Sequence, residues 1–320
     1  MTEAPALIHL TSPDGRLSVW IAPERGAELC GLEWEGRELL WRGRDFRPTP
    51  GWTGRAPILW PAIGRTFAPG PEPTAETFKQ APLGWAVDGV DYPMPMHGFA
   101  RSLPWQVEEQ TPSSLRLVLT DSEQTRAFYP FGFRHTLTYA LADDGLTLDH
   151  DIQAAETNTT PMPFVLGNHA TFRLAANAVL TSNTTRRVPL DPAGRPTGGS
   201  VEFTRLARPA AVDTIQTFEV IALKTTGAPP WAKLSFPSAP SITVGVHARD
   251  RARSRLEAVT LWGDPSGGYL SLEAWLGLPN ALASGGAPCL LASGAAEQAA
   301  ILIGISAANS SGHGDKFARD

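Results

Sequence analysis

Four segments of the chain place an ionisable side chain inside an otherwise apolar or Gly- and Pro-rich stretch. They are PILWPAIGR ending at Arg65, PMHGFAR around His97, PFVLGNHATF around His169, and YLSLEAW around Glu273. Burial in such surroundings shifts the pKa of an ionisable group, so these four residues are candidates for acid–base chemistry. Taken singly, each also fits an ordinary role, since a lone histidine is often hydrogen-bonded in a core and a lone strand glutamate often faces solvent.

Taken together and in order, longer blocks around these residues resemble a known family. The blocks GRAPILWPAIGR, MHGFARSLPW, PMPFVLGNHATFRL and LSLEAWLGLPN are similar to the aldose 1-epimerase (galactose mutarotase-like) family, over roughly Ser18 to Ile305. The HGFAR block is closer to a divergent bacterial branch than to the galactose-specific branch, which has HGG there and often Pro at the position of Ala170. The resemblance implies a large antiparallel β-sandwich whose concave face holds a sugar-binding cleft.

The resemblance also implies a role for each of the four residues. His169 matches the general acid and Glu273 the general base, while Arg65 and His97 match positions that contact sugar hydroxyls or the ring oxygen. These roles suit the interconversion of anomers, because opening a cyclic hemiacetal removes a proton from the C1 hydroxyl and delivers one to the ring oxygen. The expected function is therefore an aldose 1-epimerase, a cofactor-independent isomerase acting on a hexose or related aldose.

Other functions remain open for the same residues. A non-catalytic carbohydrate-binding or sensing protein would use the cleft without an acid–base pair. A hexose-6-phosphate mutarotase would add a basic phosphate pocket, to which Arg101 and the basic cluster at 249–255 could contribute.

Two further functions for the four residues are disfavoured. A metal-dependent enzyme of the cupin type would place close ligands such as H-x-H on one strand, whereas His97 and His169 stand far apart. A glycoside hydrolase would need a second carboxylate facing Glu273. We therefore expect no metal and no cofactor.

Strands must position these residues, because the apolar residues alternate in almost every segment. Residues 16–21 and 114–119 show this period of two, and hairpin turns are expected at 142–145 and 263–268. The pattern predicts an all-β protein, a sandwich or barrel, in which only Ala295–Ala300 is expected to hold a short helix.

Strand alternation also predicts the surroundings of Glu273. Its side chain should lie on the face opposite the leucines of its strand, with Trp275 on the same side as a wall of the cleft. Two long turn-rich segments, 43–56 and 69–82, are either surface loops or further walls of that cleft. Without a repeat or a clear linker, residues 1–306 are predicted to form a single domain and residues 307–320 a flexible tail.

Composition limits the partners and the compartment. The chain has 320 residues, is 42% hydrophobic and 18% charged, and carries a net charge of −5, which disfavours nucleic acid and anionic lipid as partners. No apolar run approaches the ~20 residues of a membrane-spanning helix, and the N-terminus lacks the features of a secretory signal. Cys30 and Cys289 are expected to be buried thiols, with one long-range disulfide as the alternative. These features favour a cytoplasmic protein, and the oligomeric state is not predicted.

Overall fold

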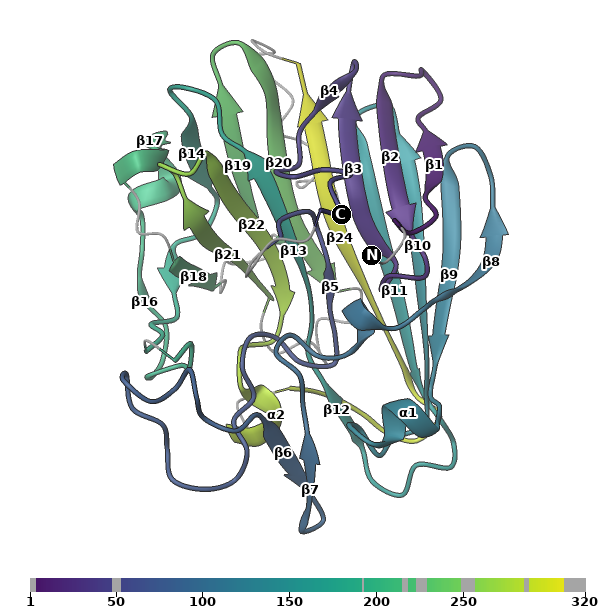
Figure 1. Ribbon diagram of the computed structural model, residues 1–320. Helices are drawn as coiled ribbons and strands as arrows, with labels where there is room; N and C mark the ends of the chain where they lie inside the picture. The colour runs from purple at the N-terminus through teal and green to yellow at the C-terminus, as the bar shows by residue number, and fades with distance from the viewer. Residues whose placement is uncertain are drawn as a thin grey trace.

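Two layers of antiparallel strands make up the fold (Figure 1). Side chains that point between the layers form one extended apolar core. The computed structural model describes residues 4–47, 53–191, 193–214, 218–222, 229–248, 257–284 and 288–307.

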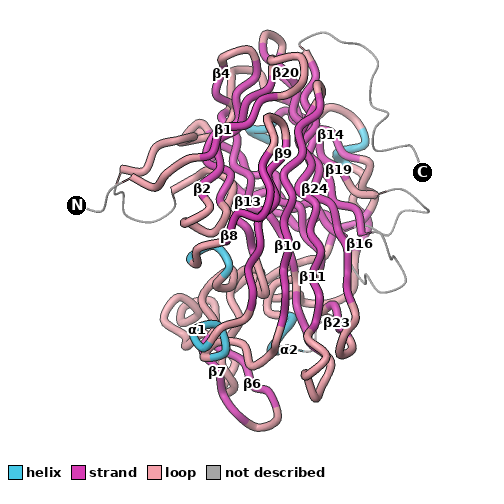
Figure 2. The backbone as a smooth tube through the Cα atoms, turned by 90° about the vertical axis from the view of Figure 1, so that its right-hand side faces the viewer, coloured by secondary structure: helices cyan, strands magenta, loops and turns pink. Residues whose placement is uncertain are grey.

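The first layer is a nine-stranded sheet. Figure 2 shows its central strands side by side, and their pairing is antiparallel throughout. In sheet order its strands are β17 (Ala210–Ala211), β14 (Val179–Ser182), β19 (Trp231–Phe236), β20 (Ala239–Ala248), β24 (Ala296–Ser306), β11 (Gly145–Ala154), β10 (Phe133–Ala142), β9 (Ser114–Thr120) and β8 (Gln106–Gln110).

The second layer combines a five-stranded and a four-stranded sheet. Isolated bridges from Leu29 to Ala56 and from Leu40 to Phe172 connect the two sheets edge to edge. The five-stranded sheet has the order β18 (Phe218–Ala222), β21 (Glu257–Asp264), β22 (Tyr269–Leu276), β13 (Leu166–Arg173) and β5 (Ile58–Leu59). The four-stranded sheet has the order β1 (Ile8–Thr11), β2 (Leu17–Ala22), β3 (Glu28–Trp34) and β4 (Arg37–Glu38).

Short elements complete the described part of the chain. Its two α-helices, α1 (Glu123–Arg126) and α2 (Ala281–Ser284), have four residues each, and no described helix is long and apolar enough to cross a membrane. The two-stranded sheets pair β6 (Gly84–Val87) with β7 (Val90–Pro93), β12 (Met162–Phe164) with β23 (Cys289–Leu291), and β15 (Arg186–Arg187) with β16 (Val201–Glu202). Three 3-10 turns are η1 (Ala100–Ser102), η2 (Arg205–Ala207) and η3 (Val212–Thr214). The predicted all-β sandwich is confirmed.

Burial differs between the strands of the two layers in a way that locates the site. Along β11, buried residues alternate with more exposed ones, as in a sheet with one face on the core. Nearly every residue of β13 and β22 is buried. Their inner faces pack in the core, and the side chains on their outer faces are covered as well.

The sequence predicted both hairpins but misassigned one strand. The turns at 142–145 and 263–268 connect β10 to β11 and β21 to β22, as expected. Ala295–Ala300, expected to hold a short helix, instead opens β24, which pairs with both β11 and β20. Two strand neighbours outweigh the helix propensity of its alanines. The basic cluster at 249–255 and residues 308–320 of the tail lie outside the described residues. The organisation into a single domain with a flexible tail stays a prediction.

Both cysteines are buried and they do not form a disulfide. Cys30 lies on β3 and Cys289 on β23. Burial and the nearby Glu28 carboxylate raise the pKa of the Cys30 thiol well above its usual value.

We expect neither cysteine of the folded protein to react with the thiol reagent DTNB, since a buried thiol is protonated and inaccessible. Denaturation without reductant should then release two reactive thiols per chain. A fast reaction in the native state, or fewer than two thiols after denaturation, would contradict this assignment.

Candidate active site

His169 and Glu273 face each other across two neighbouring strands. They are register partners in the antiparallel pair of β13 and β22. Their side chains project from the outer face of the sheet, opposite to Ala170 and Leu272, which pack in the core. His169 Nε2 lies 3.2 Å from Glu273 Oε1, and only 6% and 2% of the two side chains are exposed. The sheet register therefore brings an imidazole and a carboxylate into direct, buried contact.

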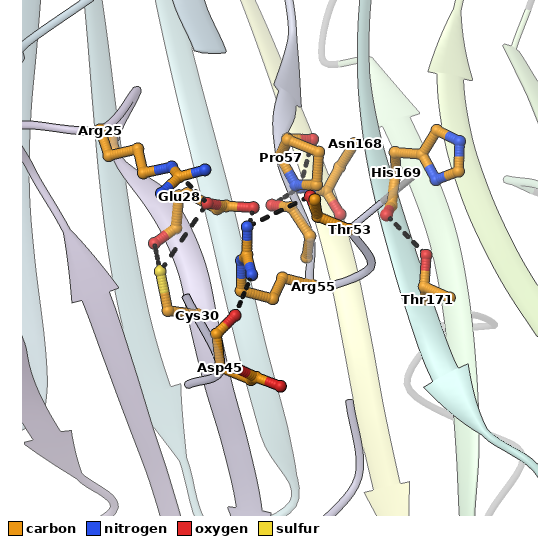
Figure 3. Close-up of polar contacts among 12 residues, drawn as sticks. Arg25, Glu28, Cys30, Asp45, Thr53, Arg55, Pro57, Asn168, His169 and Thr171 are labelled. Carbon is orange, nitrogen blue, oxygen red and sulfur yellow. Dashed lines mark hydrogen bonds and ion pairs between the residues drawn. The ribbon is translucent and has the colours of Figure 1, made fainter. Parts of the chain in front are cut away.

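The backbone around His169 is fixed by the segment leading into β5. The His169 N–H donates to the carbonyl of Pro57 over 3.0 Å. The Asn168 side-chain amide donates to the carbonyls of Ala56 (3.0 Å) and Pro57 (3.3 Å). Figure 3 shows Asn168 pointing towards Pro57 while His169 points to the opposite side of the strand. Asn168 thus fixes β13 to the segment before β5, and His169 projects from the outer face of the sheet.

Glu273 is held on its second oxygen by its own strand. The indole N–H of Trp275 donates to Oε2 over 3.1 Å. Burial raises the pKa of Glu273 to about 8, although the hydrogen bond from Trp275 opposes this shift.

Burial acts in the opposite direction on His169. It lowers the pKa of the imidazole well below its usual value, and the neighbouring His97 and Arg101 lower it further. Burial therefore favours the neutral form of both partners, a protonated carboxyl at Glu273 and a neutral imidazole at His169.

His97 lies in a tight turn that places its ring beside His169. Its φ of 67° lies in the left-handed region, and a side chain at the following Gly98 would overlap the carbonyl oxygen of Trp60. The Gly64 N–H donates to His97 Nδ1 over 3.1 Å, so the proton of the neutral ring lies on Nε2. Burial, together with Arg101 and Arg65, lowers the pKa of His97 to about 3. His97 is therefore a neutral hydrogen-bond donor at physiological pH.

A cavity of about 720 Å³ joins all four predicted site residues. This volume is within the range of small-molecule sites. The ring of His97 is 5.6 Å from that of His169, in an edge-on arrangement. The Arg65 guanidinium lies over the ring of Phe78, 5.6 Å from its centre. The lining comprises Gly64, Arg65, Phe78, Met96, His97, Arg101, His169, Asp191, Ala193, Gly194, Trp262, Glu273, Trp275 and Pro279.

The two turn-rich segments, 43–56 and 69–82, differ in whether they line the cavity. The segment 69–82 supplies Phe78 to the cavity wall, as one of its two expected roles required. None of the described residues of 43–56 lines the cavity. Arg55 of that segment is buried instead, and its Nε donates to Glu28 Oε1 over 3.1 Å (Figure 3).

Several lining residues were not singled out from the sequence. Trp262 pairs with Ser271 on β22 and so shares the face of Glu273, a position that strand alternation could have found. Asp191 lies in a turn, where no periodicity marks it. Arg195 binds the Asp191 carboxylate at 2.7 Å and the carbonyl of Pro73 at 3.0 Å, which fastens this turn to the Phe78 segment.

The site has a positively charged side. Arg101 lines the cavity, and the negative charge of Glu28 acts on its guanidinium. Glu28 itself forms an ion pair with Arg55 and lies 3.8 Å from Arg25. Two arginines of the lining, Arg65 and Arg101, therefore place positive charge at the cavity. Within the described residues, no group of three or more His, Cys, Asp or Glu side chains could hold a metal ion.

Comparison with known proteins identifies the family. The family model for aldose 1-epimerase matches residues 7–221, more than half of the chain. The chain belongs to the aldose 1-epimerase family. The resemblance carried by the four sequence blocks is thereby confirmed at the level of the family.

Individual relatives are distant. A candidate glucose-6-phosphate 1-epimerase of Escherichia coli (strain K12) is 27% identical over 144 residues, which are 42% of this chain and 40% of that protein. A galactose mutarotase-related enzyme of Lactobacillus acidophilus superposes with a TM-score of 0.75 at 22% identity, covering 95% of this chain and 99% of that one. A galactose mutarotase-like protein of Lactobacillus casei gives 0.73 at 24% identity, covering 94% and 100%. At these identities the two structures show a shared fold.

We expect Glu273→Gln to stabilise the protein, and to do so increasingly as the pH rises from 5 to 8. The folded-state pKa of Glu273 is raised to about 8 from an ordinary value of 4.5. The stabilising contribution of its protonation is complete below the unfolded pKa and is lost as the pH rises through the folded pKa. Glutamine does not titrate, so the Tm difference between variant and wild type should grow over this range.

Thermal melts at several pH values measure this difference. Glu109→Gln, at an exposed position of β8, is the control and should show no such trend. A Tm difference that stays constant with pH would contradict the raised pKa.

Proposed function

We propose that this protein is a cofactor-independent aldose 1-epimerase that interconverts the α and β anomers of a hexose or related aldose. The observation that supports it most is the buried contact between His169 and Glu273, in a cavity that Arg65 and His97 also line. This arrangement supplies one proton donor and one proton acceptor within reach of a single small molecule.

The proposed reaction begins with the proton moving from Glu273 to His169 as the sugar binds. The Glu273 carboxylate then accepts the proton of the C1 hydroxyl, and the His169 imidazolium donates its proton to the ring oxygen. The C1–O5 bond breaks and the open-chain aldehyde forms. Rotation about C1–C2 and the reverse transfers close the ring on the other face, so every proton is returned and no cofactor is consumed.

Arg65 and His97 have binding roles in this proposal. The guanidinium of Arg65 can donate several hydrogen bonds to sugar hydroxyls, and its contact with Phe78 orients it. The Nε2–H of the neutral His97 ring supplies a further donor. Such donors fix the sugar relative to the reacting pair, which contributes orientation as well as affinity.

A hexose 6-phosphate is the second candidate substrate. Arg101 lines the cavity together with Arg65, and two guanidinium groups at one cavity suit a phosphate. A relative matched over part of its length is a candidate glucose-6-phosphate 1-epimerase. Polarimetry with free and 6-phosphorylated hexoses distinguishes the two substrates by their kcat/KM.

We expect Glu273→Gln and His169→Gln each to lower kcat for mutarotation by roughly 10²-fold or more, because each removes one proton-transfer group while keeping its size. Polarimetry of freshly dissolved α-glucose and α-galactose measures the rate, and circular dichroism checks the fold. Wild-type mutarotation that survives both substitutions would exclude the acid–base assignment. Sugar binding without any wild-type mutarotation would instead favour a non-catalytic carbohydrate-binding protein.

Arg65→Ala should raise KM for the sugar and also lower kcat, since the side chain contributes both binding and orientation. His97→Ala should have the same effects to a smaller extent. Arg116→Ala, at an exposed site on β9, serves as the control for loss of an arginine. Unchanged KM and kcat in both site variants would assign Arg65 and His97 a purely structural role.

A further inference from the structure

Glu273 makes two different contacts with its two carboxylate oxygens. Oε1 faces His169 Nε2 at 3.2 Å, and Oε2 accepts the indole N–H of Trp275 at 3.1 Å. The oxygen that meets the imidazole is thus distinguished from the one that is held by the protein. A carboxylate fixed in this way cannot rotate freely about its last bond, so its reacting oxygen keeps one direction.

Trp275 is itself rigidly placed. Its side chain is 2% exposed and packs in a small apolar cluster that includes Leu59, Ile63 and Val165. Because Trp275 follows Glu273 by two residues on β22, both side chains lie on the outer face of the sheet. Strand geometry and packing together aim the indole N–H at the carboxylate.

Gly167 on the neighbouring strand makes room for this indole. It is the register partner of Trp275 across β13 and β22. A methyl group at Gly167 would lie 2.9 Å from Trp275 Cδ1 and 3.0 Å from the carbonyl oxygen of Ala274. A side chain at this position would therefore press on both the indole and the backbone of β22 and disturb the contact of the indole with Glu273.

We propose that Trp275 is a positioning residue for the reaction assigned to His169 and Glu273, and that Gly167 provides the space this role requires. The inference rests on the proposed function for its catalytic meaning. The indole N–H stabilises the ionised carboxylate and directs Oε1 towards His169. The ring lines the cavity but is only 2% exposed, so we assign the main sugar contacts to other lining residues.

The role has a chemical consequence that packing alone would not have. A hydrogen bond to a charged group stabilises the charged form, so its loss should raise the pKa of Glu273 by about one to two units. The proposed reaction needs one proton on the His169–Glu273 pair, and that proton is lost at alkaline pH. Removing the indole donor should therefore move the alkaline limb of the kcat/KM profile upwards and lower kcat.

The test compares wild type with Trp275→Phe, which keeps an aromatic ring but removes the N–H donor. Two readouts are measured: the pH profile of kcat/KM by polarimetry, and the pKa of Glu273 by NMR of ¹³C-labelled glutamate carboxyl groups. The Glu273 resonance is assigned by its loss in Glu273→Gln. We expect the pKa and the alkaline limb to rise together, kcat to fall roughly tenfold, and KM to stay within about twofold of wild type.

Trp85→Phe is the matched control. Trp85 is also buried, and its indole N–H donates to the carbonyl of Phe128 over 2.9 Å, away from the cavity. The same substitution there also deletes a buried indole hydrogen bond, yet it should leave the Glu273 pKa and the pH profile unchanged.

Gly167→Ala is the second variant and covers the case in which Trp275→Phe does not fold. It keeps the donor but displaces it, so the Glu273 pKa should again rise. An unchanged Glu273 pKa in both folded variants overturns the proposal, and so does an equal rise in Trp85→Phe. If the wild type lacks mutarotase activity but the NMR pKa still rises in Trp275→Phe, the proposed function fails while the positioning of the carboxylate stands.

Discussion

The facing pair of His169 and Glu273 is the constraint on which the rest of the site depends. Its 3.2 Å contact is set by the register of β13 and β22, because the two residues are direct partners in that ladder. A slip of either strand by one residue would turn the side chain of that strand into the core and separate the pair. The apolar residues on the inner faces, such as Ala170 and Leu272, fix that register, so the core of the sandwich specifies the geometry of the reactive pair.

Burying two ionisable groups on the outer face of a sheet has a cost that the surroundings must limit. An unpaired buried charge is strongly destabilising, whereas the neutral forms that burial favours in His169 and Glu273 carry no charge. Trp275 satisfies the second oxygen of the carboxylate. Turns around His97 and Asp191 and the segment of Phe78 line the same cavity, and the burial of the pair shifts its pKa values.

A second group of buried charges, the ion pair of Glu28 and Arg55 with the nearby Arg101, influences the pKa values of the site. Glu28 and Arg55 form an ion pair with side chains 7% and 2% exposed, and Arg101 extends the positive charge from this cluster to the cavity. The backbone carbonyl of Arg55 accepts the N–H of Thr171, two residues after His169. The cluster therefore both supports β13 and lowers the pKa of the histidines through Arg101.

Periodicity predicted the parts of this arrangement that lie on strands. The all-β fold, the two hairpins and the shared face of Glu273 and Trp275 all follow from a period of two. Ala295–Ala300 was misassigned because its pairing with two distant strands is not encoded locally. That Arg65, His97, His169 and Glu273 meet was expected from the resemblance to a family and not from spacing, since they stand far apart in the chain.

The parts contributed by loops were beyond sequence reasoning. Asp191 owes its position to Arg195, which also holds Pro73, a residue more than a hundred positions earlier. The direct contact of His169 with Glu273 was equally unforeseen, because it depends on the pairing of two strands that lie about a hundred residues apart in the chain. Contacts between distant segments depend on how the layers close, and no local pattern reports that closure.

The neutral form of the pair gives this contact a meaning for the proposed reaction. With the proton on Glu273 and a neutral His169, the buried pair carries no net charge and has the protonation state that ring opening would leave behind. Burial thus favours the form that accompanies the open-chain aldehyde, and the proposed reaction passes through the ionic form when a closed ring is bound. Because either anomer is opened and formed by the same two transfers in reverse, one proton on one pair is sufficient for both directions. The proposed reaction consequently needs donors that favour the ionised carboxylate, and the indole of Trp275 places such a donor on Glu273.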